Sequence, residues 1–166
     1  VLIETAIAVP LMLILILGGV ELGDYYRTKQ KLMNITWEIA NISLRKCGEG
    51  FPPFQEEVIK TCIYNTLDGG ISAGIEELIL SQLPDFESKG TMILTPLIDG
   101  ERFSGGYHYK FPSLSSESSL IDYGSLNLSA PLGFTVELFY ERSLFSGFGP
   151  LIGFDLPRRI YEAGVI

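Results

Sequence analysis

The side chains that most often carry out catalysis are sparse in this sequence. Its 166 residues include a single histidine, His108, which lies between two tyrosines in a stretch that alternates aromatic and polar residues. No serine, cysteine or aspartate stands in a recognisable motif of a nucleophilic enzyme. We therefore expect His108 to be a surface residue of a strand, and the sequence predicts no catalytic residue and no enzyme.

Two segments carry residue types that could bind a ligand, but neither has the required spacing. Asp99-Gly100-Glu101 offers two carboxylates to calcium without the spacing of an EF-hand, so it is better interpreted as a turn. Gly147, Gly149 and Gly153 lie in an apolar connection that lacks the lysine of a phosphate-binding loop. We predict no metal site and no cofactor.

The two cysteines, Cys47 and Cys62, can form one covalent link. Two thiols and one histidine cannot complete a structural zinc site. In a secreted chain an even number of cysteines at modest spacing favours a disulfide, and two free buried thiols are the alternative.

The net charge of −8 excludes the usual nucleic-acid interface. Phosphate binding needs clustered basic residues, and the 12 lysines and arginines form no run. The same distribution argues against a polybasic attachment to anionic lipid. An acidic exterior is typical of a secreted protein that stays soluble.

The apolar residues are concentrated at the N-terminus. No charge occurs from Thr5 to Val20, and a glutamate stands at each end of this segment, Glu4 and Glu21. The sequence begins at Val1 and shows no basic region before the apolar segment. We interpret the chain as processed and expect this segment to belong to the mature protein.

We expect residues 1–46, which include the apolar segment with Glu4 and Glu21, to form a single helix. Such a helix measures about 65–70 Å, far more than the width of a small domain, so its first part must project. We divide the chain into a projecting apolar helix, 1–24, and a head, 25–166. In the head, the spacing of the apolar residues along this helix predicts a broad apolar face that packs on a sheet. Two adjacent stripes form it: Leu32, Ile35, Ile39 and Ile42, and Met33, Trp37, Ala40 and Leu44.

The remaining pattern predicts an α+β fold, with two short helices followed by an antiparallel sheet. The helices are expected at 54–67 and 72–83, and the strands at 91–98 (interrupted by Pro96), 107–111, 134–140 and 158–165. The serine-rich stretch 112–130 is expected to be a surface loop. It contains Ser113 to Ser119 and, further along, Asn127, both candidate positions for glycans.

Several N-terminal features together resemble one protein family. Glu4 is followed by an early proline, Pro10, then by the pair Gly18-Gly19, the step Glu21-Leu22 and the pair Tyr25-Tyr26. This arrangement resembles the TadE-like branch of the type IV pilin and pseudopilin superfamily. The C-terminal segment FTVELFYERS, with the Gly-rich connection after it, is more loosely similar.

The resemblance implies a pilin-like subunit whose apolar helix first anchors it in the cytoplasmic membrane and then forms the core of an extracellular filament. It implies a prepilin peptidase and an inner-membrane assembly machinery as partners, and many copies of the chain itself. The implied assembly residues are Val1, Glu4, Pro10, Gly18 and Gly19. The carboxylate of Glu4, the fourth residue here and usually the fifth in type IV pilins, would pair with the α-amino group of an adjacent subunit.

Two other functions fit the same sequence. The chain could be a minor pseudopilin that initiates or caps a pilus or secretion machine. It could also be a monomeric binding domain held by a single-pass membrane anchor, although the uncharged segment spans about 24 Å as a helix, slightly less than a typical hydrocarbon core of about 30 Å.

Overall fold

The computed structural model describes residues 2–48, 55–64, 71–103, 108–112, 116–126, 130–142 and 157–166, with side chains from Ala6 onward. Its elements follow the order α1 (Leu2–Cys47), α2 (Glu56–Tyr64), α3 (Ile71–Gln82), α4 (Phe86–Lys89), β1 (Gly90–Ile98), β2 (Glu101–Arg102), β3 (Tyr109–Phe111), the 3-10 turn η1 (Tyr123–Ser125), β4 (Leu132–Glu141) and β5 (Arg159–Val165). The predicted α+β class, with a long N-terminal helix and an antiparallel sheet, is confirmed.

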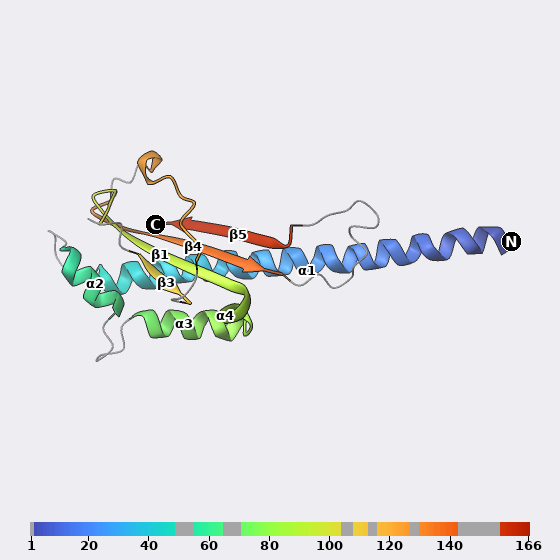
Figure 1. Ribbon diagram of the computed structural model, residues 1–166, viewed down its shortest axis with the longest axis horizontal. Helices are drawn as coiled ribbons and strands as arrows, with labels where there is room; N and C mark the ends of the chain where they lie inside the picture. The colour runs from blue at the N-terminus through green and yellow to red at the C-terminus, as the bar shows by residue number, and fades with distance from the viewer. Residues whose placement is uncertain are drawn as a thin grey trace.

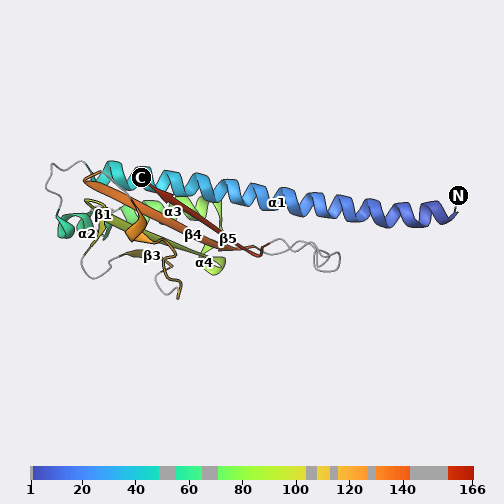
Figure 2. The same ribbon diagram turned by 90° about the horizontal axis from the view of Figure 1, so that it is seen from above.

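The helix α1 runs along the whole molecule. It has 46 residues and continues through Pro10 without a break. At 1.5 Å per residue its length is about 69 Å. Figures 1 and 2 show the sheet and the other helices gathered around its C-terminal half, while its N-terminal half extends alone.

The sheet has the order β2-β1-β4-β5, and β3 also pairs with β1. All of its pairings are antiparallel. A tight turn at Asp99 and Gly100 links β1 to β2, and both residues adopt positive φ, which favours glycine at the second position. This confirms that Asp99-Gly100-Glu101 belongs to a turn.

The core lies between α1 and one face of the sheet. Leu32, Ile35 and Ile39 are fully buried on α1, as their 3-4 spacing predicts. Alternate residues of β4 face them from the sheet: Phe134, Val136, Leu138 and Tyr140. The isoleucines at positions 59, 63, 75 and 79 of α2 and α3 complete the same core.

A disulfide fixes α2 to the end of α1. Cys47 and Cys62 are bonded, with their Cα atoms 5.8 Å apart. The helix α2 is predicted over 54–67; residues 54 and 65–67 lie outside the described part of the chain.

Two predictions about the strands and one about α1 need correction. β1 is not interrupted at Pro96; the residue pairs with Phe134 of β4, and on the other edge it lies between the positions paired with β3 and β2. A proline there removes no bond to those two strands. β3 begins at Tyr109, so His108 precedes it, and Tyr107 lies outside the described residues. Of the second stripe on α1, Ala40 is buried and Leu44 packs against the core, as predicted, but the side chains of Met33 and Trp37 are exposed.

Candidate assembly surface

The N-terminal half of α1 presents an apolar surface that the rest of the chain leaves uncovered. Among the described side chains before Val20, the large apolar residues Ile7, Leu11, Met12, Leu15 and Ile16 are each more than half exposed. Within the described part of the chain this is the one helix long and apolar enough to cross a membrane, and only 6% of its apolar window is buried. A core helix of a soluble protein would be mostly buried, so this surface needs lipid or another chain to cover it.

The structure places some of the predicted assembly residues on this surface. Gly18 and Gly19 lie one after the other on α1, and a Cβ atom added at either would meet nothing within 4 Å. Another helix could therefore approach the backbone closely at this point. Pro10 lies inside α1, whereas Val1 and the side chain of Glu4 lie outside the described residues.

Arg142 holds α1 at the point where the helix leaves the head. Its guanidinium is buried, donates a hydrogen bond to the carbonyl oxygen of Glu21 (3.2 Å) and lies 3.6 Å from the carboxylate of Asp24. It also stands over the ring of Tyr25, 5.7 Å from its centroid. These contacts join the end of β4 to the first turn of α1 that the head buries, and so fix where the projecting half begins.

Two contacts with β5 hold the next turns of α1. The ammonium group of Lys29 lies 3.4 Å from the carboxylate of Glu162. Two residues further along the strand, Gly164 lies so close to Thr36 that an added Cβ would be 2.7 Å from the Thr36 Cγ2 atom. The C-terminal strand β5 thus packs directly against α1.

The sheet face opposite α1 carries a buried polar cluster centred on Glu137. This carboxylate has no exposed surface and accepts hydrogen bonds from the Leu120 amide (2.8 Å) and the Tyr161 hydroxyl (3.0 Å). The Tyr123 hydroxyl lies 3.5 Å from its other oxygen and donates to the hydroxyl of Thr95 (3.1 Å). The described part of the serine-rich stretch, 116–126, therefore packs on the sheet through polar contacts.

Two tyrosines of the head have a raised pKa. Burial is the first cause for both, and hydrogen bonds to the carboxylates of Asp85 and Glu137 raise the pKa of Tyr140 and Tyr161, respectively, further. Asp85 in turn has a lowered pKa. The main cause is the hydrogen bond that its carboxylate accepts from Lys89, and the hydrogen bond from Tyr140 lowers the pKa further. These shifts belong to structural contacts of the head.

Comparison with known proteins identifies the element that forms the apolar surface. Residues 1–40 match the family described as TadE-like protein. The N-terminal segment is TadE-like. No curated protein and no solved structure matches the chain significantly.

The TadE-like segment covers two different parts of α1. It includes the exposed apolar half and continues through Leu32, Ile35 and Ile39, which are buried against the sheet. The sheet, the short helices and the disulfide lie beyond the match. The similarity thus concerns the helix that carries the uncovered surface.

Other sequence candidates lie away from the TadE-like segment. Across the part of the chain that the structure describes, no three His, Cys, Asp or Glu side chains are grouped to hold a metal. Asn127 and the glycines at 147, 149 and 153 lie outside the described residues. The buried contacts of Arg142 and Glu137 were not predicted from the sequence; a glutamate within the mainly apolar strand β4 was the available signal for the second.

Proposed function

We propose that this protein is a structural, non-enzymatic subunit that polymerises through α1 into an extracellular Tad-like pilus, used for adhesion or surface attachment. Before assembly the same helix anchors the subunit in the cytoplasmic membrane, where a prepilin peptidase and the inner-membrane assembly machinery act on it. The observation that carries the proposal is the TadE-like helix whose apolar half projects uncovered from a folded head.

The apolar half suits a filament core better than a permanent anchor. Its uncharged stretch, Thr5 to Val20, spans about 24 Å as a helix, whereas the hydrocarbon core of a bilayer is about 30 Å thick. Extending the stretch to Val1 brings in Glu4, and a carboxylate in lipid is costly unless it is paired. In a filament the cation can come from another copy, and the α-amino group of a processed subunit is one such group.

Glu4 therefore provides the test of the proposal. We expect Glu4→Ala and Glu4→Val to reach the membrane at the wild-type level but to be depleted at least tenfold from filaments sheared from cells. The removed charge pair is made only in the polymer, so the subunit itself keeps its stability. Glu38→Ala, which removes an exposed glutamate from the head half of α1, is the matched control and should assemble normally.

Quantitative immunoblots of the membrane and sheared fractions measure both pools. Wild-type filament yield from both Glu4 variants would contradict the assembly role of this residue. Filaments that contain only traces of the wild-type chain would indicate a minor pseudopilin, and a wild-type chain confined to the membrane fraction would indicate an anchored monomer.

A further inference from the structure

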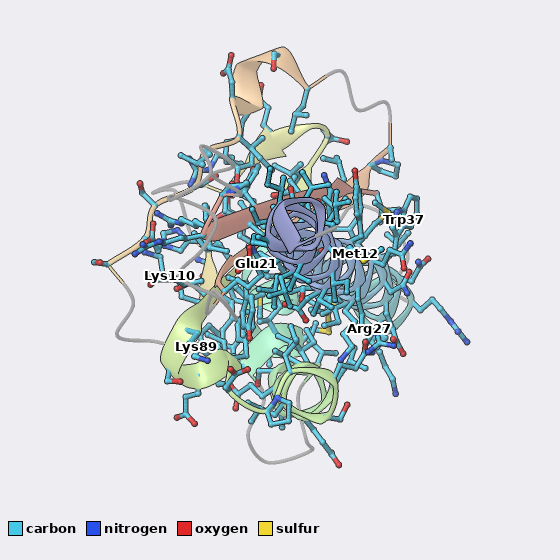
Figure 3. The ribbon with its side chains drawn as sticks, turned by 90° about the vertical axis from the view of Figure 1, so that its right-hand side faces the viewer. Met12, Glu21, Arg27, Trp37, Lys89 and Lys110 are labelled. Carbon is cyan, nitrogen blue, oxygen red and sulfur yellow. A yellow bond between two sulfur atoms is a disulfide. The ribbon has the colours of Figure 1, made fainter. Side chains whose placement is uncertain are left out.

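A row of apolar side chains continues from the projecting half of α1 onto the head. In the head it contains Tyr26, Met33 and Trp37, which are 56%, 44% and 54% exposed. The complete row, here called the outer stripe, consists of Met12, Leu15, Gly19, Leu22, Tyr26, Met33 and Trp37. Figure 3, a view along α1 from its N-terminal end, shows Met12 and Trp37 on the same side of the helix, away from Glu21.

The spacing of the outer stripe is that of a helix–helix seam. Successive members are separated by three, four, three, four, seven and four residues, so they form one line along the helix. The sheet packs on the opposite side, at Leu32, Ile35 and Ile39. The exposed ring of Trp37 belongs to this line of apolar side chains. Such a line can pack against a second helix.

Lipid cannot cover the head part of this stripe. Trp37 lies 16 residues beyond Glu21, which corresponds to about 24 Å along the helix. Asp24, Arg27 and Lys31 lie between them, and a bilayer core that reached Trp37 would have to hold these charges. Any cover over this part of the stripe is therefore a protein surface in water.

The charges beside the stripe indicate which protein surface this is. Arg27 follows Tyr26, is exposed and forms no ion pair with any residue that the structure describes. Figure 3 shows Arg27 below Met12 and Trp37, at the edge of the stripe and away from Glu21. Glu4, one helical turn before Ala8, is the only charged residue among the first 20. An apolar helix with one carboxylate at its start complements an apolar stripe with one cation at its start.

We propose that the outer stripe of the head receives the projecting helix of a second copy of this chain, in parallel and shifted by about 22 residues, roughly 33 Å. Met12 and Leu15 of the second copy then lie against Met33 and Trp37, and Glu4 of the second copy lies beside Arg27. The helices are parallel because copies anchored by the same end in one membrane point their heads in the same direction. Glu4 has two carboxylate oxygens, so it can pair with Arg27 of one copy and the α-amino group of another. This inference rests on the proposed function and adds the partner surface and its register.

The register can be tested by disulfide cross-linking in filaments sheared from cells. The two native cysteines are already bonded to each other. A chain carrying both Ala8→Cys and Gln30→Cys, two exposed positions 22 residues apart along the stripe, should form a ladder of cross-linked chains on mild oxidation. The control pairs Ala8→Cys with Lys31→Cys, because Lys31 turns toward α3 and donates to the carbonyl of Gln82. We expect at least tenfold less cross-linking in the control.

The charge pairing has its own test. Arg27→Glu should lower the filament yield at least tenfold, whereas Arg27→Lys keeps the cation and should retain most of the yield. Arg45→Glu makes the same change of charge at another exposed position of α1 and should leave the yield near the wild-type level. The level of each variant in the membrane fraction shows whether it folds.

The outcomes separate this inference from the proposed function. If wild-type filaments form but the pair at positions 8 and 30 cross-links no better than the control, or Arg27→Glu assembles normally, the inferred register is wrong and the pilus subunit stands. If the wild-type chain forms no filaments, the proposed function itself fails.

Discussion

Glu137 shows how one residue can tie a loop to the sheet. A carboxylate with no exposed surface is costly in a strand unless donors surround it. Here the Leu120 amide and the Tyr161 hydroxyl donate to it from two different segments, one of them the loop over the sheet. The stability of the buried Glu137 carboxylate therefore depends on residues 116–126 staying in place over the sheet.

We predict that Glu137→Ala lowers the free energy of unfolding by about 3 kcal/mol, because it leaves buried donors unsatisfied. Denaturant unfolding of the purified chain in detergent micelles measures this. Glu137→Gln keeps an acceptor oxygen and should lose less, and Glu141→Ala, at the exposed end of the same strand, should change stability by less than about 0.5 kcal/mol. Equal losses for the alanine variants at 137 and 141 would contradict this account.

The buried Tyr140 predicts a loss of stability at alkaline pH. The pKa of Tyr140 is raised above its ordinary value of 10.0 in the folded state, by burial and by the hydrogen bond to Asp85. The unfolded chain releases this proton first, so the stabilisation is complete below about pH 10 and decreases as the pH rises above it. Tyr140→Phe should therefore lose less stability than the wild type between about pH 9 and pH 11. Parallel pH curves for the two proteins would show that Tyr140 contributes nothing to the decrease.

At the scale of the elements, the contact between β5 and α1 depends on a missing side chain. Gly164 faces Thr36, and a methyl group added there would overlap the Thr36 Cγ2 atom. Val136 of β4 pairs with Gly164 from the other side, so the strand cannot move away without disturbing the sheet.

We predict that Gly164→Ala destabilises the head by about 1–3 kcal/mol through overpacking. Thr36→Ser removes the offending methyl and retains the hydroxyl that bonds to the Leu32 carbonyl, so the double variant should recover most of the loss. Thermal unfolding of the single and double variants measures the coupling. The nearby change Ala163→Ser is the control, and additive effects at positions 36 and 164 would argue against the contact.

Periodic elements were predictable because burial on one face leaves a regular pattern. The buried line Leu32, Ile35 and Ile39 and the alternating residues of β4 both follow their elements' periods. The width of the buried face of α1 was not predictable: Met33 and Trp37 are as apolar as the buried residues, and only the position of the sheet leaves them exposed. The pattern alone cannot tell a surface that packs inside one chain from one that packs between chains.

Contacts between segments far apart in the sequence were also not predictable. Arg142 meets the carbonyl of Glu21 across 121 sequence positions, and the segment that covers Glu137 has no periodic pattern. The tolerance of β1 for Pro96 also depends on which positions β2 and β3 leave unpaired. The assembly role of the residues in the projecting half stays a prediction, and the continuation of the exposed apolar surface onto the head was not foreseen from the sequence.

The whole molecule combines a stable head with an exposed apolar helix. The sheet, the disulfide and the contacts of Arg142 hold the C-terminal half of α1, while the N-terminal half has no partner among the described residues of its own chain. Such a shape is stable in water only when the apolar half is covered. The TadE-like match falls on this helix, and we expect other copies to provide the cover.

The most direct measurement is electron microscopy of material sheared from cells and pelleted at high speed, with mass spectrometry of the same pellet. We predict thin filaments in which this chain is the dominant protein, because a shaft built on α1 needs many copies. A pellet without filaments, with the chain remaining entirely in the membrane fraction, would contradict polymerisation through α1.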